Sequence, residues 1–172
     1  YTPFDNSNVN IVTGQTPLYS NSVTINNSTY KLGTGSMYFN NTSLIQGISY
    51  INYYLSSGLP SQFTISYWMN IAVMPDNINQ VREMTFYYYP LYKRQGTWYF
   101  IVYSVNMNTG QNYAYINGTQ YGPNSYTPFS PYSYGTITVG NQSINGGAEG
   151  FNGYIDDFRI YNYTLAPSSV QA

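Results

Sequence analysis

The stretch Gly150 to Val170, GFNGYIDDFRIYNYTLAPSSV, contains the clearest structural pattern in this chain. Residues 154–161 are rich in aromatic and branched side chains, which favour β-strands. Gly153 precedes them, and a turn cluster from Asn162 to Pro167 follows them. The pattern therefore predicts a strand over Tyr154 to Tyr161 that ends in a proline-marked turn.

Alternation along this strand separates its two adjacent acids. It predicts that one face carries Tyr154, Asp156, Phe158 and Ile160, and that the other carries Ile155, Asp157, Arg159 and Tyr161. Asp157 then has Arg159 as a neighbour on a face that water can cover. Asp156 stands among apolar side chains and needs donors or a cation, because an unpaired buried charge is costly.

Four further stretches occur in order before this one, and with it they span most of the chain, from Gly35 to Val170. They are Gly35 to Asn40 (GSMYFN), Phe63 to Asn70 (FTISYWMN), Trp98 to Gly118 (WYFIVYSVNMNTGQNYAYING) and Ile137 to Gly140 (ITVG). The ordered set resembles the LamG-like jelly rolls of the concanavalin A-like lectin and glucanase superfamily. This resemblance implies an all-β fold, an antiparallel β-sandwich of the concanavalin A-like jelly-roll type, and is less specific for function.

Residue patterns elsewhere agree with a sandwich. Residues 63–71 alternate with period two, which indicates a strand with one face in a core. Asn117-Gly118 predicts a two-residue hairpin turn. We expect further short strands at 9–12, 23–25, 36–39, 49–55, 81–89 and 98–105, a long loop over 122–134, and no helix beyond a turn or two after Leu165. A chain of 172 residues fits one domain over 1–172, and because it begins at Tyr1 without a signal-like segment we expect it to be part of a longer chain.

Charge is scarce, since only 6% of residues are charged and the net charge is −1, whereas the chain holds 23 tyrosines. Without a basic cluster, neither nucleic acid nor an anionic membrane surface is an expected partner. The sequence contains no run of 18 apolar residues, so insertion into a membrane is not expected. One core cannot enclose 23 tyrosines with every hydroxyl group hydrogen-bonded. We therefore expect many of them at the surface or in contacts with a partner.

Catalysis is not expected. The chain has no histidine or cysteine, which removes the common nucleophilic triads. Glycosidases of the superfamily place two carboxylates across the scissile bond, and the retaining branch carries them in an E-x-D-x-E pattern. None of the six acids forms that pattern.

Calcium is the metal that suits the oxygen ligands of this chain. The resemblance implies that the first and last strands lie side by side and, in some relatives, hold calcium. Asp5 and Asp156 would then be ligands. The alternative is structural: Asp156 accepts backbone N–H groups and Asp5 caps a turn.

Aromatic loops are the other candidate site, because sugar rings stack on tyrosine while amides and hydroxyls read their hydroxyl groups. The predicted glycan-binding residues lie in the long loop and are Tyr126, Tyr132 and Tyr134, with Asn124 and Ser133 as polar partners. A second group is Tyr50, Tyr53 and Tyr54, whereas Trp68 and Trp98 are expected in the core. The sequence favours a non-catalytic recognition module of an extracellular, cell-surface or virion-surface protein. The alternative is a structural subunit of a capsid, fibre or surface layer, whose partners are neighbouring protein subunits.

Overall fold

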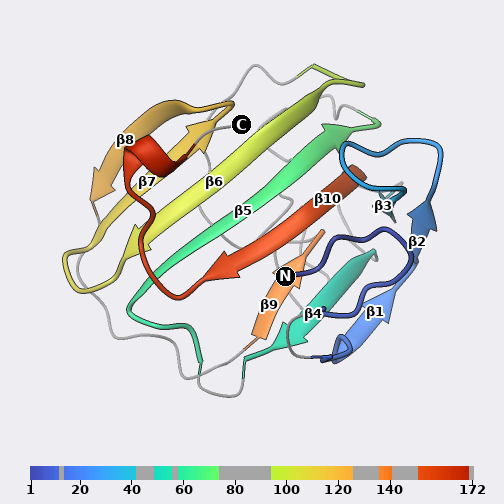
Figure 1. Ribbon diagram of the computed structural model, residues 1–172, viewed down its shortest axis with the longest axis horizontal. Helices are drawn as coiled ribbons and strands as arrows, with labels where there is room; N and C mark the ends of the chain where they lie inside the picture. The colour runs from blue at the N-terminus through green and yellow to red at the C-terminus, as the bar shows by residue number, and fades with distance from the viewer. Residues whose placement is uncertain are drawn as a thin grey trace.

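Two antiparallel sheets make up the fold in the computed structural model, which describes residues 1–11, 14–41, 49–55, 58–73, 94–125, 136–140 and 151–170. The larger sheet has the order β2 (Val23–Asn26), β3 (Ser36–Asn40), β10 (Asn152–Tyr161), β5 (Gln62–Ile71), β6 (Trp98–Asn106), β7 (Gln111–Ile116) and β8 (Thr119–Ser125). The smaller sheet has the order β1 (Tyr19–Asn21), β4 (Tyr50–Tyr54) and β9 (Thr136–Val139). Figure 1 shows β10, β5, β6 and β7 side by side across the molecule. The predicted antiparallel β-sandwich of the jelly-roll class is confirmed.

The main core lies on one face of the larger sheet. The alternating residues of β5, Phe63, Ile65, Tyr67, Met69 and Ile71, are all completely buried there, as their period predicts. Ile51 and Tyr53 of β4 and Ile137 and Val139 of β9 join the same cluster. The two sheets therefore pack face to face through this cluster, and the opposite face of the larger sheet is left for other contacts.

Strand β10 confirms the strand predicted over 154–161, but its faces differ from the prediction. Asp156 lies opposite Trp68 and Arg159 lies opposite Ser66, with a register shift between them. Asp157 has a positive φ of 53°, as expected for an extra residue in a β-bulge. The alternation predicted past Asp156 is therefore wrong: Phe158 joins the core, whereas Asp156 and Arg159 share the opposite face.

The hairpin predicted at Asn117-Gly118 is confirmed. Both residues have positive φ, 48° and 81°, as a type I′ turn requires, and they join β7 to β8. The prediction of a loop over 122–134 is wrong for residues 122–125, which belong to β8, and the rest of that range lies outside the described residues. Pro123 fits within β8 because that strand lies at the sheet edge.

Near the amino terminus, the strand expected over 9–12 is wrong for its described residues, since 9–11 form a bend and a turn. Thr2 instead forms a β-bridge with Phe158 of β10, which brings the two ends of the chain together as the family resemblance implies. The strand predicted over 81–89 lies outside the described residues. No helix in the described part of the chain is long and apolar enough to cross a bilayer.

Candidate functional site

The carboxyl-terminal segment, residues 162–170, lies on the face of the larger sheet opposite the main core. The Thr64 hydroxyl of β5 holds it, donating to the Tyr163 carbonyl and accepting the Leu165 N–H, both at 2.9 Å. Further on, Val170 packs against Val102 of β6 and Tyr115 of β7 in a second small apolar cluster. Between these anchors the segment forms the short 3-10 helix Pro167–Ser169, which confirms the turn expected after Leu165.

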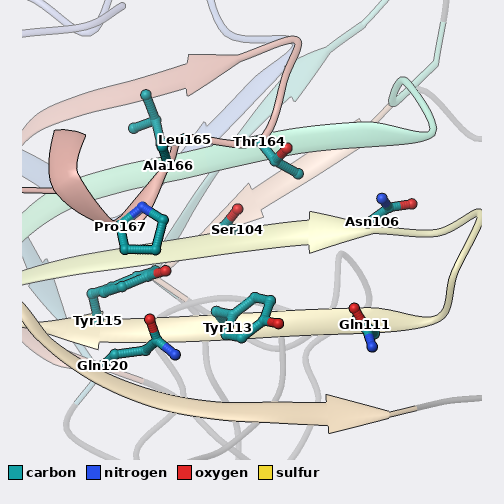
Figure 2. Close-up of a pocket in the computed structure, with 10 residues that line it drawn as sticks. All are labelled: Ser104, Asn106, Gln111, Tyr113, Tyr115, Gln120, Thr164, Leu165, Ala166 and Pro167. Atoms are coloured by element: carbon teal, nitrogen blue, oxygen red, sulfur yellow. The ribbon is translucent and has the colours of Figure 1, made fainter.

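A groove of about 400 Å³ lies between this segment and the strands beneath it. Figure 2 shows residues 164–167 on one side, Ser104 and Asn106 of β6 along the middle, and the side chains of β7 and β8 on the other side. The lining residues are Ser104, Asn106, Gln111, Tyr113, Tyr115, Gln120, Thr164, Leu165, Ala166 and Pro167. Alternation along β7 explains its share of this lining, because Gln111, Tyr113 and Tyr115 are every second residue of the strand and so share one face.

The groove is polar but uncharged: two tyrosines, three amides and two hydroxyls line it, with no Asp, Glu, Lys or Arg. Tyr113 is half-buried, and Gln111 and Gln120 are exposed. Burial raises the pKa of Tyr115, and the neighbouring Tyr113 raises it further, so its hydroxyl is neutral at physiological pH. The side-chain oxygen Oδ1 of Asn106 already accepts the backbone N–H groups of Asn108 and Thr109. The groove thus offers aromatic surface beside neutral donors and acceptors, and no described group within it can transfer a proton as a carboxylate pair would.

None of the residues predicted to bind glycan is among the described residues that line this groove. Tyr126, Tyr132, Ser133 and Tyr134 lie outside the described residues. Asn124 lies in β8, where its backbone pairs with Asn112, and its side chain is not described. Because Ser125 pairs with Gln111 of the groove, strand β8 ends next to the groove.

The aromatic residues outside the predicted loop differ in how deeply they are buried. Tyr53 is a core residue whose hydroxyl donates to the Asn8 carbonyl at 2.9 Å, and burial raises its pKa to about 12. Tyr54 is 48% exposed. The expectation that Trp68 and Trp98 lie in the core is wrong: both are half-buried, and their registers place them on the sheet face that carries the groove.

Asp156 and Asp5 hold the two ends of one loop, residues 31–35. Asp156 Oδ2 accepts the N–H groups of Lys31 and Leu32, each at 2.8 Å. Asp5 Oδ1 accepts the N–H groups of Thr34 at 2.5 Å and Gly35 at 3.2 Å. The structural role considered for both carboxylates is therefore confirmed.

Whether this pair also suits calcium depends on the oxygen atoms that remain. Asp156 is 1% exposed and its Oδ1 atom has no hydrogen-bond partner, which would fit one cation ligand. However, backbone N–H donors already occupy Asp156 Oδ2 and Asp5 Oδ1, and no cluster of three acidic, histidine or cysteine side chains occurs among the residues that the structure describes. These donors fit structural carboxylates better than a calcium shell of six to eight oxygens, so calcium binding stays a prediction.

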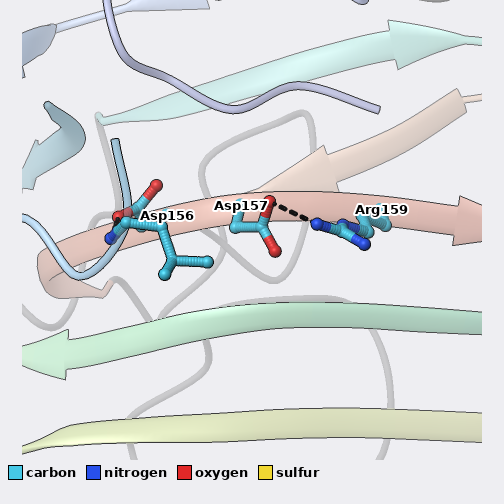
Figure 3. A network of polar contacts seen from close by, with 4 residues as sticks. Asp156, Asp157 and Arg159 are labelled. Atoms are coloured by element: carbon cyan, nitrogen blue, oxygen red, sulfur yellow. Dashed lines mark hydrogen bonds and ion pairs between the residues drawn. The ribbon is translucent and has the colours of Figure 1, made fainter. Parts of the chain in front are cut away.

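Asp157 forms an ion pair with Arg159, as the sequence predicts. Figure 3 shows Arg159 beside Asp157, and their Nη2 and Oδ1 atoms are 2.9 Å apart. Asp157 is only 5% exposed, so the wetter surface expected for it is wrong. The ion pair satisfies Asp157 at the bulge, and the two acids do not act together.

With this geometry in place, the chain can be compared with known proteins. Residues 90–171 match the model of the Concanavalin A-like lectin/glucanases superfamily, Laminin_G_3. The predicted family resemblance is confirmed over this part of the chain. The matched residues include β6, β7, β8 and the carboxyl-terminal segment, which are the elements of the groove. No curated protein sequence matches the chain.

Solved structures share the fold at low sequence identity. One is domain 4 of AbnA, a GH43 extracellular arabinanase from Geobacillus stearothermophilus, in complex with arabinotriose, with a TM-score of 0.55 and 22% identity over 84% of this chain and 78% of that one. Another is the heptameric SAP-like pentraxin of Limulus polyphemus, with a TM-score of 0.54 and 14% identity over 74% of each chain. At these identities the likeness concerns the fold alone.

Proposed function

We propose that this chain is a non-catalytic recognition module that binds a neutral glycan in the groove between residues 164–167 and strands β6–β8. The observation that carries the proposal is the lining itself: tyrosine rings beside amide and hydroxyl groups, without a charged side chain. Ligand sites commonly combine aromatic walls with a few polar groups that fix orientation. Uncharged sugars match this combination, because their C–H faces pack on rings while their hydroxyls exchange hydrogen bonds with amides.

The predicted loop residues extend this proposal. Asn124 lies near the end of β8, and Tyr126, Tyr132, Ser133 and Tyr134 come after this strand in the sequence. We propose that they contact the same glycan beyond the groove. The family match and the arabinotriose complex of the AbnA domain support a carbohydrate ligand.

Glycan hydrolysis is not part of the proposal. A glycosidase needs two carboxylates on either side of the bond it cleaves. The groove has none, and the described acids are used elsewhere: Asp5 and Asp156 hold the loop 31–35, and Asp157 pairs with Arg159. Binding without cleavage is the function that these residues support.

A role as an assembly subunit is the second candidate. The observation that favours it is the scarcity of charge together with exposed apolar side chains, including Tyr30, Leu32 and Tyr163, each at least 45% exposed. Interface cores are depleted in charge and enriched in tyrosine. Either role suits an extracellular, cell-surface or virion-surface protein, and the extracellular origin of the AbnA domain supports that setting.

A glycan array combined with sedimentation velocity separates the two roles. The recognition role predicts binding to defined neutral glycans by a chain that sediments as a monomer over a wide concentration range. The assembly role predicts concentration-dependent association and no binding on the array. Running the array in calcium and in chelator shows in addition whether ligand binding needs the metal.

A further inference from the structure

A second aromatic surface lies on the same sheet face as the groove. Trp68 of β5 and Phe100 of β6 are directly opposite each other, and their ring centroids are 5.1 Å apart. Tyr38 of β3 and Tyr154 of β10 form another pair at 4.9 Å. All four rings are half-buried and stand outside the main core. We call them the aromatic platform.

The platform is separate from the groove, although both lie on β6. Phe100 is near the start of that strand, whereas Ser104 and Asn106 of the groove are near its end. Val102 lies between them and is covered by Val170. Phe100 also packs against this cluster, which includes Tyr115 of the groove, so the exposed Lys31 beside Trp68 is the part of this surface that can be varied apart from the groove.

One cation rests on the platform. Lys31 is exposed, and its Nζ atom lies 4.4 Å from the centroid of the Trp68 ring. Such a cation–π contact holds an ammonium group over an aromatic face. Among the residues that the structure describes, no carboxylate lies within ion-pair distance of this ammonium group, so its donors are available to a ligand.

The backbone of Lys31 is also fixed. Its N–H donates to Asp156 Oδ2, and the other end of the loop is held by Asp5 through Thr34 and Gly35. Asp156 itself is buried and its Oδ2 atom accepts two amide N–H groups, so its charge is partly compensated. Because the loop is held at both ends, little conformational entropy would be lost when a ligand binds the ammonium group.

We propose that the aromatic platform with Lys31 is a second binding site, for a sugar that carries a carboxylate. The sugar ring packs on Phe100, and its carboxylate accepts a charge-assisted hydrogen bond from Lys31 Nζ. Charge complementarity carries the choice of ligand, since the groove lining has no charged side chain and the platform has an ammonium group with no anionic partner among the described residues. This inference does not depend on glycan binding in the groove.

Titration calorimetry with trigalacturonate and with its neutral counterpart galactotriose tests this site. The wild type is expected to bind trigalacturonate at least tenfold more tightly than galactotriose. Lys31→Gln should lose this preference, whereas Lys31→Arg should keep most of it, because the cation is retained. Phe100→Leu keeps an apolar side chain but removes the ring, and should weaken trigalacturonate binding without reversing the preference.

The proposal is overturned if the wild type binds both trisaccharides equally, or if Lys31→Gln binds trigalacturonate as tightly as the wild type. Inorganic sulfate is the control for charge alone. Displacement of trigalacturonate by an equal concentration of sulfate would show an unspecific anion site and would also overturn it. Lys31 is exposed and anchors the loop through its backbone, so its side-chain variants are expected to fold, with circular dichroism as the check.

Discussion

The hydroxyl group of Thr64 accepts the backbone N–H of Leu165 at 2.9 Å, across 101 residues of sequence. The same hydroxyl donates to the Tyr163 carbonyl. One completely buried side chain on β5 thus satisfies two backbone groups of the segment that walls the groove. The shape of the groove consequently depends on a residue that does not line it.

Thr64→Val is expected to lower the free energy of unfolding by about 1–3 kcal/mol, because it leaves the partly buried Tyr163 carbonyl and Leu165 N–H without their partner. Glycan affinity should fall as well, since the groove wall loses its anchor. Thr24→Val, on an exposed position of β2, is the matched control and should change stability by less than about 0.5 kcal/mol. Urea unfolding gives the free energy of unfolding of both variants. Equal values for Thr64→Val and Thr24→Val would contradict the anchoring role of Thr64.

Gly33→Ala should destabilise the loop 31–35 more than backbone strain alone explains. Gly33 has a φ of 66°, and an added Cβ would stand 1.9 Å from Asp5 Oδ1. Gly14 has nearly the same φ, 69°, with open space around it, so Gly14→Ala isolates the strain, roughly 1–3 kcal/mol for a non-glycine residue. Thermal melts of the two variants should differ, with Gly33→Ala lower. Identical melting temperatures would mean that Asp5 does not hold this loop closely.

Asp156 predicts a pH dependence of stability. Burial raises its pKa above the ordinary 3.8, despite hydrogen bonds from Leu32 and Lys31 that lower it. A folded-state pKa above the unfolded value means that the folded protein binds the proton more tightly. The contribution of Asp156 to stability is therefore greatest below pH 3.8 and declines as the pH rises through the raised pKa.

Asp156→Asn removes this titration while an amide oxygen still accepts the two N–H groups. The unfolding free energy of the wild type, relative to this variant, should thus fall between acidic and neutral pH in chelator. A difference independent of pH would show that Asp156 keeps an ordinary pKa. Asp156→Ala loses the acceptor altogether, which should cost about 1–3 kcal/mol at any pH.

Calcium binding by Asp5 and Asp156 can be decided by melting temperature. The amide donors to both carboxylates lead us to expect the same melting temperature in calcium and in chelator. A bound ion would instead raise it by mass action. It would do so through Asp156 Oδ1, the buried oxygen without a partner, and the increase would vanish in Asp156→Asn.

Regular alternation made much of the fold predictable from the sequence. The five buried residues of β5 follow period two without interruption, and Asn117-Gly118 marks its turn by backbone preference alone. Prediction failed at Asp157, because a bulge inserts one residue and reverses the faces after it. Nothing in the side chains of Asp156 and Asp157 distinguishes a bulge from a regular strand.

The groove was missed for a different reason. Its residues come from β6, β7, β8 and the carboxyl-terminal segment, and only the register of these elements brings them together. The outward series Gln111, Tyr113 and Tyr115 is visible in the sequence, but it does not indicate that residues 164–167 lie above it. By contrast, the Asp157–Arg159 ion pair was predictable, because its partners are two residues apart.

Glycan binding in the groove is tested most directly by titrating the strongest neutral oligosaccharide from the array into two tyrosine variants. Tyr113→Ala removes a ring that lines the groove, and Tyr54→Ala removes an exposed ring on the smaller sheet. The account predicts that Tyr113→Ala weakens binding about tenfold or more, while Tyr54→Ala binds as the wild type does. Wild-type affinity in a folded Tyr113→Ala variant would contradict it.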